Sequence, residues 1–370
     1  MAAVEERRRI VAVIGTTAVG KSKLGMALAL ALDGEIVSCD SIQVYAGLPL
    51  ASNQPTAAEL AAVRHHLVGH VAMDGTYSVH QFVAEAHAAI DDIFARGKVP
   101  IVVGGTHYYL NALAVAPLPS AQLAAAVAAA DPSAAVDASH LDLAALAQAD
   151  DATAHAALAS VDPVTAARTH PSARRSVNTA LRTVVQTGVR HSNVVKAQRA
   201  APEPARYEPL LLWPRAELDV LDARIDARVD AMVDRGLLAE LDAAAELLAS
   251  GGASQGGDAG LVQAIGLKEF APYLESRTSA ALEACLVQHK LATRQYARSQ
   301  IKYIRNVFVR RGVKVYPLDA TDDSASGWEA AVKAPAEAAA RAWLAGSEVG
   351  LSAEKAPAEE AHDPWAVFTS

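Results

Sequence analysis

Short apolar runs alternate with amphipathic segments along the first third of the chain. The runs at residues 10–14 and 100–103 are continuously apolar, and residues 35–39 include Ile36, Val37 and Cys39. Each run is followed by glycine or aspartate, which is typical of buried parallel strands. Residues 21–32 and 82–96 carry apolar side chains at helical spacing. Strands that alternate with helices predict an α/β fold, in which helices flank a parallel sheet on both faces.

The middle of the chain has a different character. Residues 118–206 are rich in alanine and lack runs of β-branched residues, so we expect short helices there. The apolar run at 207–213 predicts a strand that returns the chain to the sheet. Long helices over 216–250 and 280–309, and a last strand over 313–317, complete the expected elements.

These patterns divide the chain into three parts. We expect an α/β core from residues 1–117 and 207–320, interrupted by an inserted all-helical domain at 118–206. The remainder, 321–370, is rich in Ala, Glu, Pro and Ser. It predicts one helix near 328–344 and a disordered tail.

Composition excludes several classes of protein. No run of about 18 apolar residues occurs, so we expect neither a transmembrane helix nor a membrane partner. The two cysteines, Cys39 and Cys285, are far apart and form no CxxC pair, which favours a reducing compartment and argues against a zinc site. We expect a monomeric cytoplasmic protein, with a mitochondrial or nuclear pool left open.

The segment that follows the first strand has the pattern G-x-x-x-x-G-K-[ST] of a phosphate-binding loop. It lies between a predicted strand and a predicted helix, as that interpretation requires. Its backbone N–H groups would surround phosphate oxygens, Lys21 would neutralise their charge, and Ser22 could bind Mg²⁺. The loop consists of Gly15, Thr16, Thr17, Ala18, Val19, Gly20, Lys21 and Ser22.

Polar side chains also follow the other two early strands. Asp40 comes directly after the second strand, and Thr106 follows the third. The carboxyl ends of parallel strands form the ligand-binding edge of such a sheet, so both residues are candidates for the site. Asp40 could accept a proton or hold Mg²⁺, and nearby Gln43 could bind a base edge. The third strand lacks the acidic residue of a typical ATPase, which weakens that interpretation.

Charge is unevenly distributed. The net charge is −8, which argues against a general nucleic-acid coat protein, yet residues 289–314 contain basic charges and no acid. On a helix, four of these cations are successive i+4 neighbours that would repel one another, and a phosphate backbone would relieve that repulsion. They are Lys290, Arg294, Arg298 and Lys302.

Taken together, these segments resemble the tRNA dimethylallyltransferase family, also called tRNA isopentenyltransferases. The Asp40-Ser-x-Gln-x-Tyr45 and Gly104-Gly-Thr106 elements beside the loop are fairly specific, and the spelling Gly-Gly-Thr-His-Tyr-Tyr-Leu looks like fungal members. The matching segments follow the family order over most of the chain, at residues 15–22, 38–48, 65–67, 77–82, 100–110, 162–171, 263–266 and 292–297.

The resemblance implies a P-loop NTPase-like sheet with an inserted tRNA-binding domain, Mg²⁺ as cofactor and transfer RNA as partner. The loop would hold the diphosphate of dimethylallyl diphosphate, with Arg224 contacting it as well. Asp40 would take a proton from the N6 amine of an adenosine next to the anticodon, and Thr106 would line the channel. The implied contacts to the anticodon stem-loop come from Ser41, Gln43, Arg174, Arg175, Gln263, Arg294, Arg298 and Lys302.

The sequence departs from the family pattern at several positions. Thr16 replaces a proline, Thr179 an arginine, Leu267 a tyrosine and Ser299 a basic residue. Two cysteines cannot build the C-terminal zinc finger that fungal and animal members often carry. The arginine lost at Thr179 predicts one anticodon-side contact fewer, and the missing zinc finger predicts a weaker hold on tRNA.

Three other functions fit part of the pattern. An adenylate isopentenyltransferase, acting on free adenine nucleotides, would share the loop, Asp40 and Thr106, but should lack the basic helix and the Gln-Ala-Ile-Gly segment at 263–266. A small-molecule kinase on the same scaffold predicts tight ATP binding and phosphoryl transfer. A non-catalytic tRNA-binding protein would have no activity for an Asp40 substitution to remove.

Overall fold

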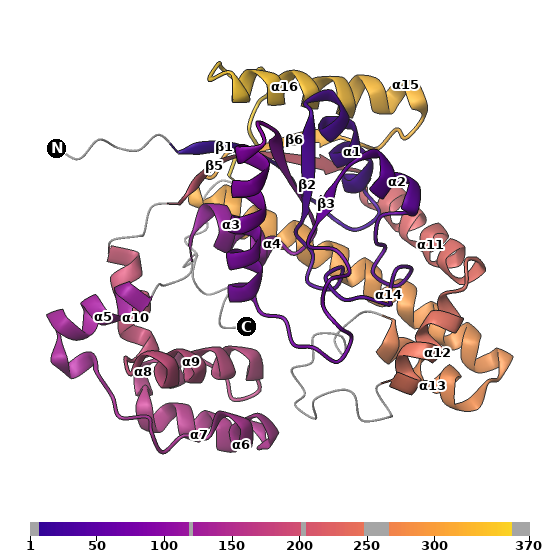
Figure 1. Ribbon diagram of the computed structural model, residues 1–370. Helices are drawn as coiled ribbons and strands as arrows, with labels where there is room; N and C mark the ends of the chain where they lie inside the picture. Colours follow the sequence, from indigo (N-terminus) through magenta and orange to yellow (C-terminus); the bar gives the residue numbers. More distant parts are fainter. Residues whose placement is uncertain (1–6, 118–120, 201–204, 248–265, 357–370) are drawn as a thin grey trace. The chain divides into compact units, whose positions relative to one another are not determined.

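The computed structural model describes residues 7–117, 121–200, 205–247 and 266–356. Within them, a parallel sheet forms the centre of the main unit (Figure 1). Its strand order is β3-β2-β4-β1-β5-β6, which confirms the predicted α/β class. The strands are β1 (Arg8–Val13), β2 (Gly34–Ser38), β3 (His65–His66), β4 (Val99–Val103), β5 (Tyr207–Arg215) and β6 (Val315–Asp319).

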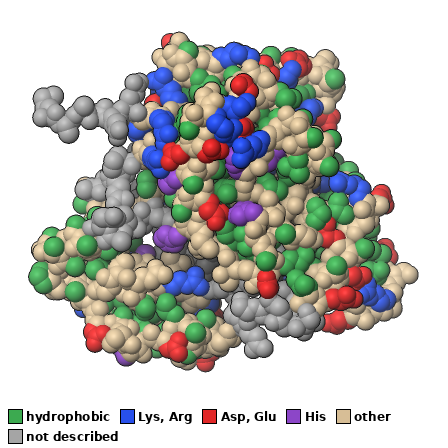
Figure 2. Space-filling model, in the orientation of Figure 1, with side chains coloured by type: hydrophobic (Ala, Val, Ile, Leu, Met, Phe, Trp, Pro, Cys, Tyr) green, Lys and Arg blue, Asp and Glu red, His purple; other side chains and the backbone are tan. Residues whose placement is uncertain are grey.

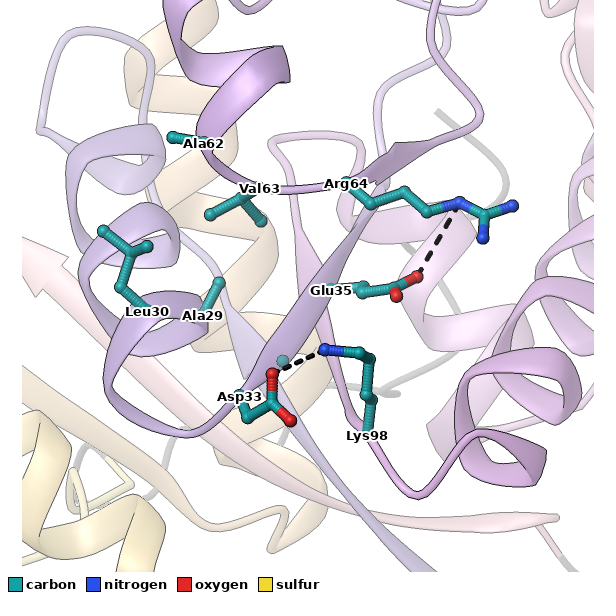
Figure 3. A pocket seen from close by; sticks show the side chains of 9 residues that line it. Ala29, Leu30, Asp33, Glu35, Ala62, Val63, Arg64 and Lys98 are labelled. Atoms are coloured by element: carbon teal, nitrogen blue, oxygen red, sulfur yellow. Dashed lines mark hydrogen bonds and ion pairs between the residues drawn. The ribbon is translucent and has the colours of Figure 1, made fainter.

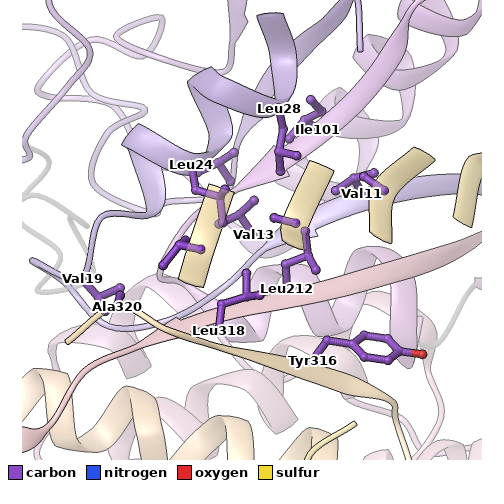
Figure 4. Close-up of a cluster of buried hydrophobic side chains, with 14 of the residues drawn as sticks. Val11, Val13, Val19, Leu24, Leu28, Ile101, Leu212, Tyr316, Leu318 and Ala320 are labelled. Atoms are coloured by element: carbon purple, nitrogen blue, oxygen red, sulfur yellow. The ribbon is translucent and has the colours of Figure 1, made fainter. Parts of the chain in front are cut away.

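Helices cover both faces of this sheet. On one face, α1 (Lys21–Ala31) packs on β2, β4 and β1, and α16 (Ala334–Leu344) packs on β1 and β5. Figure 4 shows Leu24 and Leu28 of α1 among apolar side chains of the strands, such as Val13 and Ile101. On the other face, α3 (Val79–Ala95) packs against β2 and β4. This is the arrangement that right-handed crossovers between parallel strands produce.

The predicted strands all form, but two expectations about helices are wrong. The expected single helix over 216–250 is two helices, α11 (Leu218–Asp234) and α12 (Leu237–Leu247), because Gly236 between them has a φ of 103°, which no helix contains. Residues 321–344 were expected outside the core. Instead, α15 (Ala325–Trp328) and the irregular helical turn that joins it to α16 bury Trp328 and Val332 in the main hydrophobic cluster.

The main unit has further helices besides α1, α3, α15 and α16. The longest is α14 (Ser279–Tyr303), which continues in irregular helical turns to Arg311 and runs beside α11 (Figure 1). The shorter ones are α2 (Ala57–Ala62), α4 (His107–Leu110) and α13 (Leu267–Ser276). Across the described residues, none of these helices is long and apolar enough to cross a membrane.

A second compact unit covers residues 116–205 and is all-helical where it is described. It has its own hydrophobic cluster, which includes Leu158, Val177 and Leu181. Aspartates cap several of its helices, as Asp150 does by accepting a hydrogen bond from the Thr153 N–H. The helices are α5 (Ala121–Ala130), α6 (Leu143–Gln148), α7 (Asp151–Val161), α8 (Pro163–Arg168), α9 (Arg174–Thr187) and α10 (His191–Ala200).

Candidate active site at the carboxyl edge of the sheet

The predicted phosphate loop connects β1 to α1 at the carboxyl edge of the sheet. Three of its residues, Gly15, Ala18 and Gly20, have positive φ angles of 140°, 61° and 95°. Backbone turns of this kind direct successive N–H groups toward one concavity, which suits an anion. The α1 helix starts at Lys21, so its positive end faces the same place.

Side chains from distant segments hold this loop. His107 Nε2 accepts a 3.2 Å hydrogen bond from the Gly15 N–H, and Gln300 Oε1 accepts a 2.9 Å bond from the Thr17 N–H. Burial, together with the charge of Lys21, lowers the pKa of His107 to about 3, so its ring is neutral and can accept. The Trp328 ring lies against Gly20, where an added Cβ would come within 2.6 Å of it. Sequence analysis missed these three residues.

Lys21 ends in a buried position beside the loop. Its Nζ donates a 2.6 Å hydrogen bond to the Thr16 carbonyl. Burial lowers the pKa of Lys21 to about 8, the Asp40 carboxylate opposes that shift, and the Arg228 guanidinium adds to it. Lys21 and Arg228 carry two positive charges against the single charge of Asp40, and a bound phosphate group would supply further negative charge.

Asp40 and Thr106 lie at the ends of neighbouring strands, as predicted. Asp40 Oδ1 accepts hydrogen bonds from the N–H groups of Ile42 and Gln43, at 2.9 and 3.4 Å, which fixes the carboxylate at the end of β2. Thr106 Oγ1 accepts a 3.0 Å bond from the Ser41 N–H. The structure therefore brings Asp40, Ser41 and Thr106 together with Lys21.

Tyr296, on α14, reaches the same group of residues. Burial of its hydroxyl raises the pKa of that group, and the Asp40 charge raises it further. The nearby side chains of Thr106 and Gln300 act on the hydroxyl in the opposite sense and lower its pKa. Tyr296 is thus a neighbour of the candidate base, a position that helix periodicity alone could not reveal.

The arginine expected to contact the diphosphate has other partners. Arg224 donates 2.7 and 2.8 Å hydrogen bonds to the carbonyls of Ala320 and Thr321, and it pairs with Asp323 at 3.3 Å. Arg228, one helical turn later, is the arginine whose charge acts on Lys21 and Asp40. Burial lowers the pKa of Arg228, while Asp40 opposes this. The electrostatics thus favour Arg228 as the site arginine.

Gln43 is engaged inside the protein. Its Oε1 accepts a 2.8 Å hydrogen bond from the Ser38 hydroxyl, and its Nε2 donates to the carbonyls of Ser52 and Asn53 at 3.2 and 2.8 Å. These bonds use both ends of the amide that was expected to hold an adenine. In this conformation Gln43 braces the segment after β2, and its contact with a base stays a prediction.

The basic helix has acidic partners that its own sequence does not reveal. Lys290, Arg294 and Arg298 on α14 pair with Asp230, Asp226 and Asp222 on α11, at 2.6, 3.1 and 2.7 Å. The repulsion from which a phosphate partner was inferred is therefore relieved by α11, and that argument for RNA contact is wrong. The contacts of Arg294, Arg298 and exposed Lys302 with tRNA stay predictions.

Mixed charge is common on this protein. Figure 2 shows basic and acidic side chains interspersed on the upper part of the face that it draws. Ion pairs such as Arg206–Asp91, at 2.7 Å, and Arg215–Glu354, at 3.1 Å, fit this picture. The face drawn in Figure 2 thus gives no simple electrostatic outline of a nucleic-acid site.

The remaining predicted tRNA ligands are in other surroundings. In the helical unit, Arg174 donates a 2.8 Å hydrogen bond to the Asp150 carbonyl and another to the Leu146 carbonyl. It therefore joins α9 to the ends of α6 and α7. Arg175 also lies on α9, but its side chain is outside the described part, as is the whole of Gln263.

Residues that could hold a metal are few at this site. The Ser22 side chain is exposed at the start of α1, beside the loop. Within the described residues there is no cluster of three His, Cys, Asp or Glu side chains suited to a metal. Mg²⁺ usually takes most of its ligands from phosphates and water, so one hydroxyl is compatible with it.

A pocket of about 230 Å³ lies at the opposite, amino edge of the sheet (Figure 3). Gly34, which begins β2, and Lys98, which precedes β4, are among its lining residues. In Figure 3 the Arg64 side chain points toward Glu35, and that of Lys98 toward Asp33. This pocket is separate from the residues around the loop.

Comparison with known proteins gives consistent matches. The family model described as IPP transferase matches residues 43–307. The tRNA dimethylallyltransferase of Saccharomyces cerevisiae is 33% identical over 321 residues, which cover 85% of this chain and 72% of that protein. The tRNA dimethylallyltransferase of Homo sapiens is 34% identical over 377 residues, which cover 96% of this chain and 78% of that protein.

Solved structures agree with these matches. A eukaryotic dimethylallyltransferase acting on tRNA is 32% identical, with a TM-score of 0.78 over 93% of this chain and 81% of that chain. The tRNA isopentenylpyrophosphate transferase of Bacillus halodurans is 31% identical, with a TM-score of 0.54 over 87% of this chain and 92% of that chain.

Proposed function

Because this chain belongs to the IPP transferase family, we propose that it transfers a dimethylallyl group from dimethylallyl diphosphate to tRNA. The acceptor is the N6 amine of the adenosine adjacent to the anticodon. The observation that carries this proposal is the proximity of a buried cation and an acid: the Asp40 charge acts on Lys21, whose ammonium lies beside the phosphate loop. An anionic leaving group and a base amine could meet there.

In the proposed reaction, the adenine N6 nitrogen attacks the allylic C1 carbon and forms a C–N bond. The C1–O bond breaks, and its electron pair leaves with the diphosphate. Lys21, Arg228 and the loop N–H groups stabilise the charge that develops on that leaving group. The Asp40 carboxylate accepts the proton that the amine loses, which balances the step.

Asp40 is suited to this role by its fixed position. The N–H groups of Ile42 and Gln43 hold Oδ1, and no hydrogen bond within the described residues engages Oδ2. Thr106, tied to Ser41, would border the space between the two substrates. Mg²⁺, held by the Ser22 hydroxyl and by diphosphate oxygens, would add positive charge at the leaving group.

The substrate assignment can be tested with labelled dimethylallyl diphosphate. We expect label to enter a tRNA anticodon stem-loop that carries the adenosine and not a stem-loop with guanosine at that position. Label that enters only adenosine monophosphate would instead identify an adenylate isopentenyltransferase. Binding of tRNA without transfer, at any Mg²⁺ concentration, would contradict catalytic function.

A further inference from the structure

Gln300, near the end of α14, makes two hydrogen bonds that join two parts of the site. Its Oε1 accepts from the Thr17 N–H in the phosphate loop at 2.9 Å, and its Nε2 donates to the Gly105 carbonyl at 3.0 Å. Gln300 is only 4% exposed, so water cannot easily replace either bond. One side-chain amide thus connects the loop after β1 with the turn after β4.

These two bonds require the chemistry of an amide. The Thr17 N–H needs an acceptor, and the Gly105 carbonyl needs a donor. A carboxylate supplies acceptors only, and an ammonium or guanidinium group supplies donors only. An ionised or apolar side chain at position 300 would therefore leave at least one buried backbone group without a partner.

The turn after β4 has room for the Gln300 side chain because it contains Gly105. A side chain on Gly105 would overlap the Gln300 amide, and its Cβ would lie 3.7 Å from Lys21 Nζ. Gly105 therefore allows Gln300 and Lys21 to approach the same point. Tyr296, one helical turn before Gln300, lies near both Gln300 and Thr106, whose side chains act on its hydroxyl. Gln300 is thus connected to both candidate substrate positions.

We propose that Gln300 is a positioning residue for the transfer reaction, which rests on the function proposed above. It fixes the phosphate loop relative to the turn that carries Thr106, and so sets the distance between the allylic carbon and the amine. Within the described residues, Gln300 makes its hydrogen bonds to Thr17 and Gly105 and none to Lys21 or to the N–H groups of residues 18–20. Loss of Gln300 should therefore affect the alignment of the allylic carbon with the amine more than the affinity for diphosphate.

The test compares Gln300→Met, which removes both bonds, with Gln300→Glu. Gln295, exposed on the same helix, provides the matched control Gln295→Met. For each folded variant, kcat and KM for dimethylallyl diphosphate are measured with tRNA, well below its melting temperature. Affinity for inorganic pyrophosphate is measured separately by tryptophan fluorescence, because Trp213 and Trp328 lie against Gly15 and Gly20.

We expect Gln300→Met to lower kcat by about 30- to 100-fold and to change pyrophosphate affinity by less than about threefold. A protonated glutamic acid offers both a donor and an acceptor. The kcat of Gln300→Glu, relative to the wild type, should therefore recover as pH falls, whereas that of Gln300→Met should not. A residue with only a structural role would lower the melting temperature without this pH dependence.

Two results would overturn the positioning role while leaving the proposed function intact. One is an unchanged kcat in folded Gln300→Met, and the other is a loss of kcat matched by an equal loss of pyrophosphate affinity. A wild-type protein that binds pyrophosphate but modifies no tRNA would refute the proposed function, and the positioning role with it.

Discussion

The charge of Asp40 reaches the buried ammonium of Lys21 across the carboxyl ends of β1 and β2. Burial lowers the pKa of Lys21 to about 8, and Asp40 only partly offsets this. Arg228 adds a second cation to the same region. The site therefore has positive charge on the leaving-group side and an acid on the side where an amine would approach.

Diphosphate affinity should depend on the protonation of Lys21. Below pH 8 the ammonium is charged and attracts the anion. Above pH 8 it loses its proton, so the affinity should fall by up to about tenfold per pH unit. Calorimetric titration with pyrophosphate from pH 7 to 9.5 would measure this. Lys21→Arg stays charged over this range, so its pyrophosphate affinity should not fall above pH 8. Any change that this variant does show reports the ionisation of pyrophosphate itself.

Replacing the acid should separate catalysis from binding. Asp40→Asn cannot accept the amine proton, so kcat should fall by about a hundredfold or more. Pyrophosphate affinity should be kept or increase, because a negative charge near the diphosphate is removed. Asp33→Asn, an exposed change at the other edge of the sheet, is the control and should leave kcat unaltered. Full activity in Asp40→Asn would exclude Asp40 as the base.

The two arginines of α11 should differ in what they control. Arg228→Gln removes charge beside Lys21, so we expect pyrophosphate affinity to fall by about tenfold or more. Arg224→Gln removes the bonds to Ala320 and Thr321, so its main effect should be a lower melting temperature. Fluorescence titration with pyrophosphate and thermal unfolding of both variants would show which arginine binds the diphosphate and which stabilises the fold. The opposite pattern would restore Arg224 as the diphosphate ligand.

Acid should destabilise the protein through Glu35. Hydrogen bonds from Arg96, assisted by His66, lower the pKa of this buried carboxyl from 4.5 to about 2. Above pH 4.5 it is ionised in both folded and unfolded chains. As pH falls from 4.5 toward 2 the unfolded chain takes up the proton first, so stability is lost.

We expect this loss to be about 3 kcal/mol, measured as the free energy of unfolding in urea at several pH values. Glu35→Gln should be less stable at neutral pH and should show a weaker dependence in this range. Glu283→Gln, on an exposed part of α14, serves as the control. If the free energy of unfolding of Glu35→Gln falls between pH 4.5 and 2 as much as that of the wild type, Glu35 is not the group responsible.

Local sequence patterns were enough for the sheet and for part of the site. Short apolar runs, each followed by glycine or aspartate, predict β1, β2 and β4, and parallel strands carry their carboxyl ends to one edge. The residues that follow those runs, the phosphate loop, Asp40 and Thr106, therefore had to lie near one another. Family resemblance added the reaction, which neither periodicity nor charge specifies.

Tertiary packing decided what surrounds those residues. His107, Gln300 and Trp328 support the loop from distant parts of the chain, and such long-range hydrogen bonds and contacts leave no periodic signal in the sequence. Residues four apart on a helix share a face, so helical spacing could not tell which of Arg224 and Arg228 reaches the site.

The basic stripe of α14 shows the same limit. The sequence determines that Lys290, Arg294 and Arg298 lie along one side of a helix. It does not determine what that side faces, because the aspartates that neutralise it belong to α11, about seventy residues earlier. A one-dimensional pattern fixes the direction of side chains on their own element, whereas their partners, and hence their function, are fixed only when the elements pack.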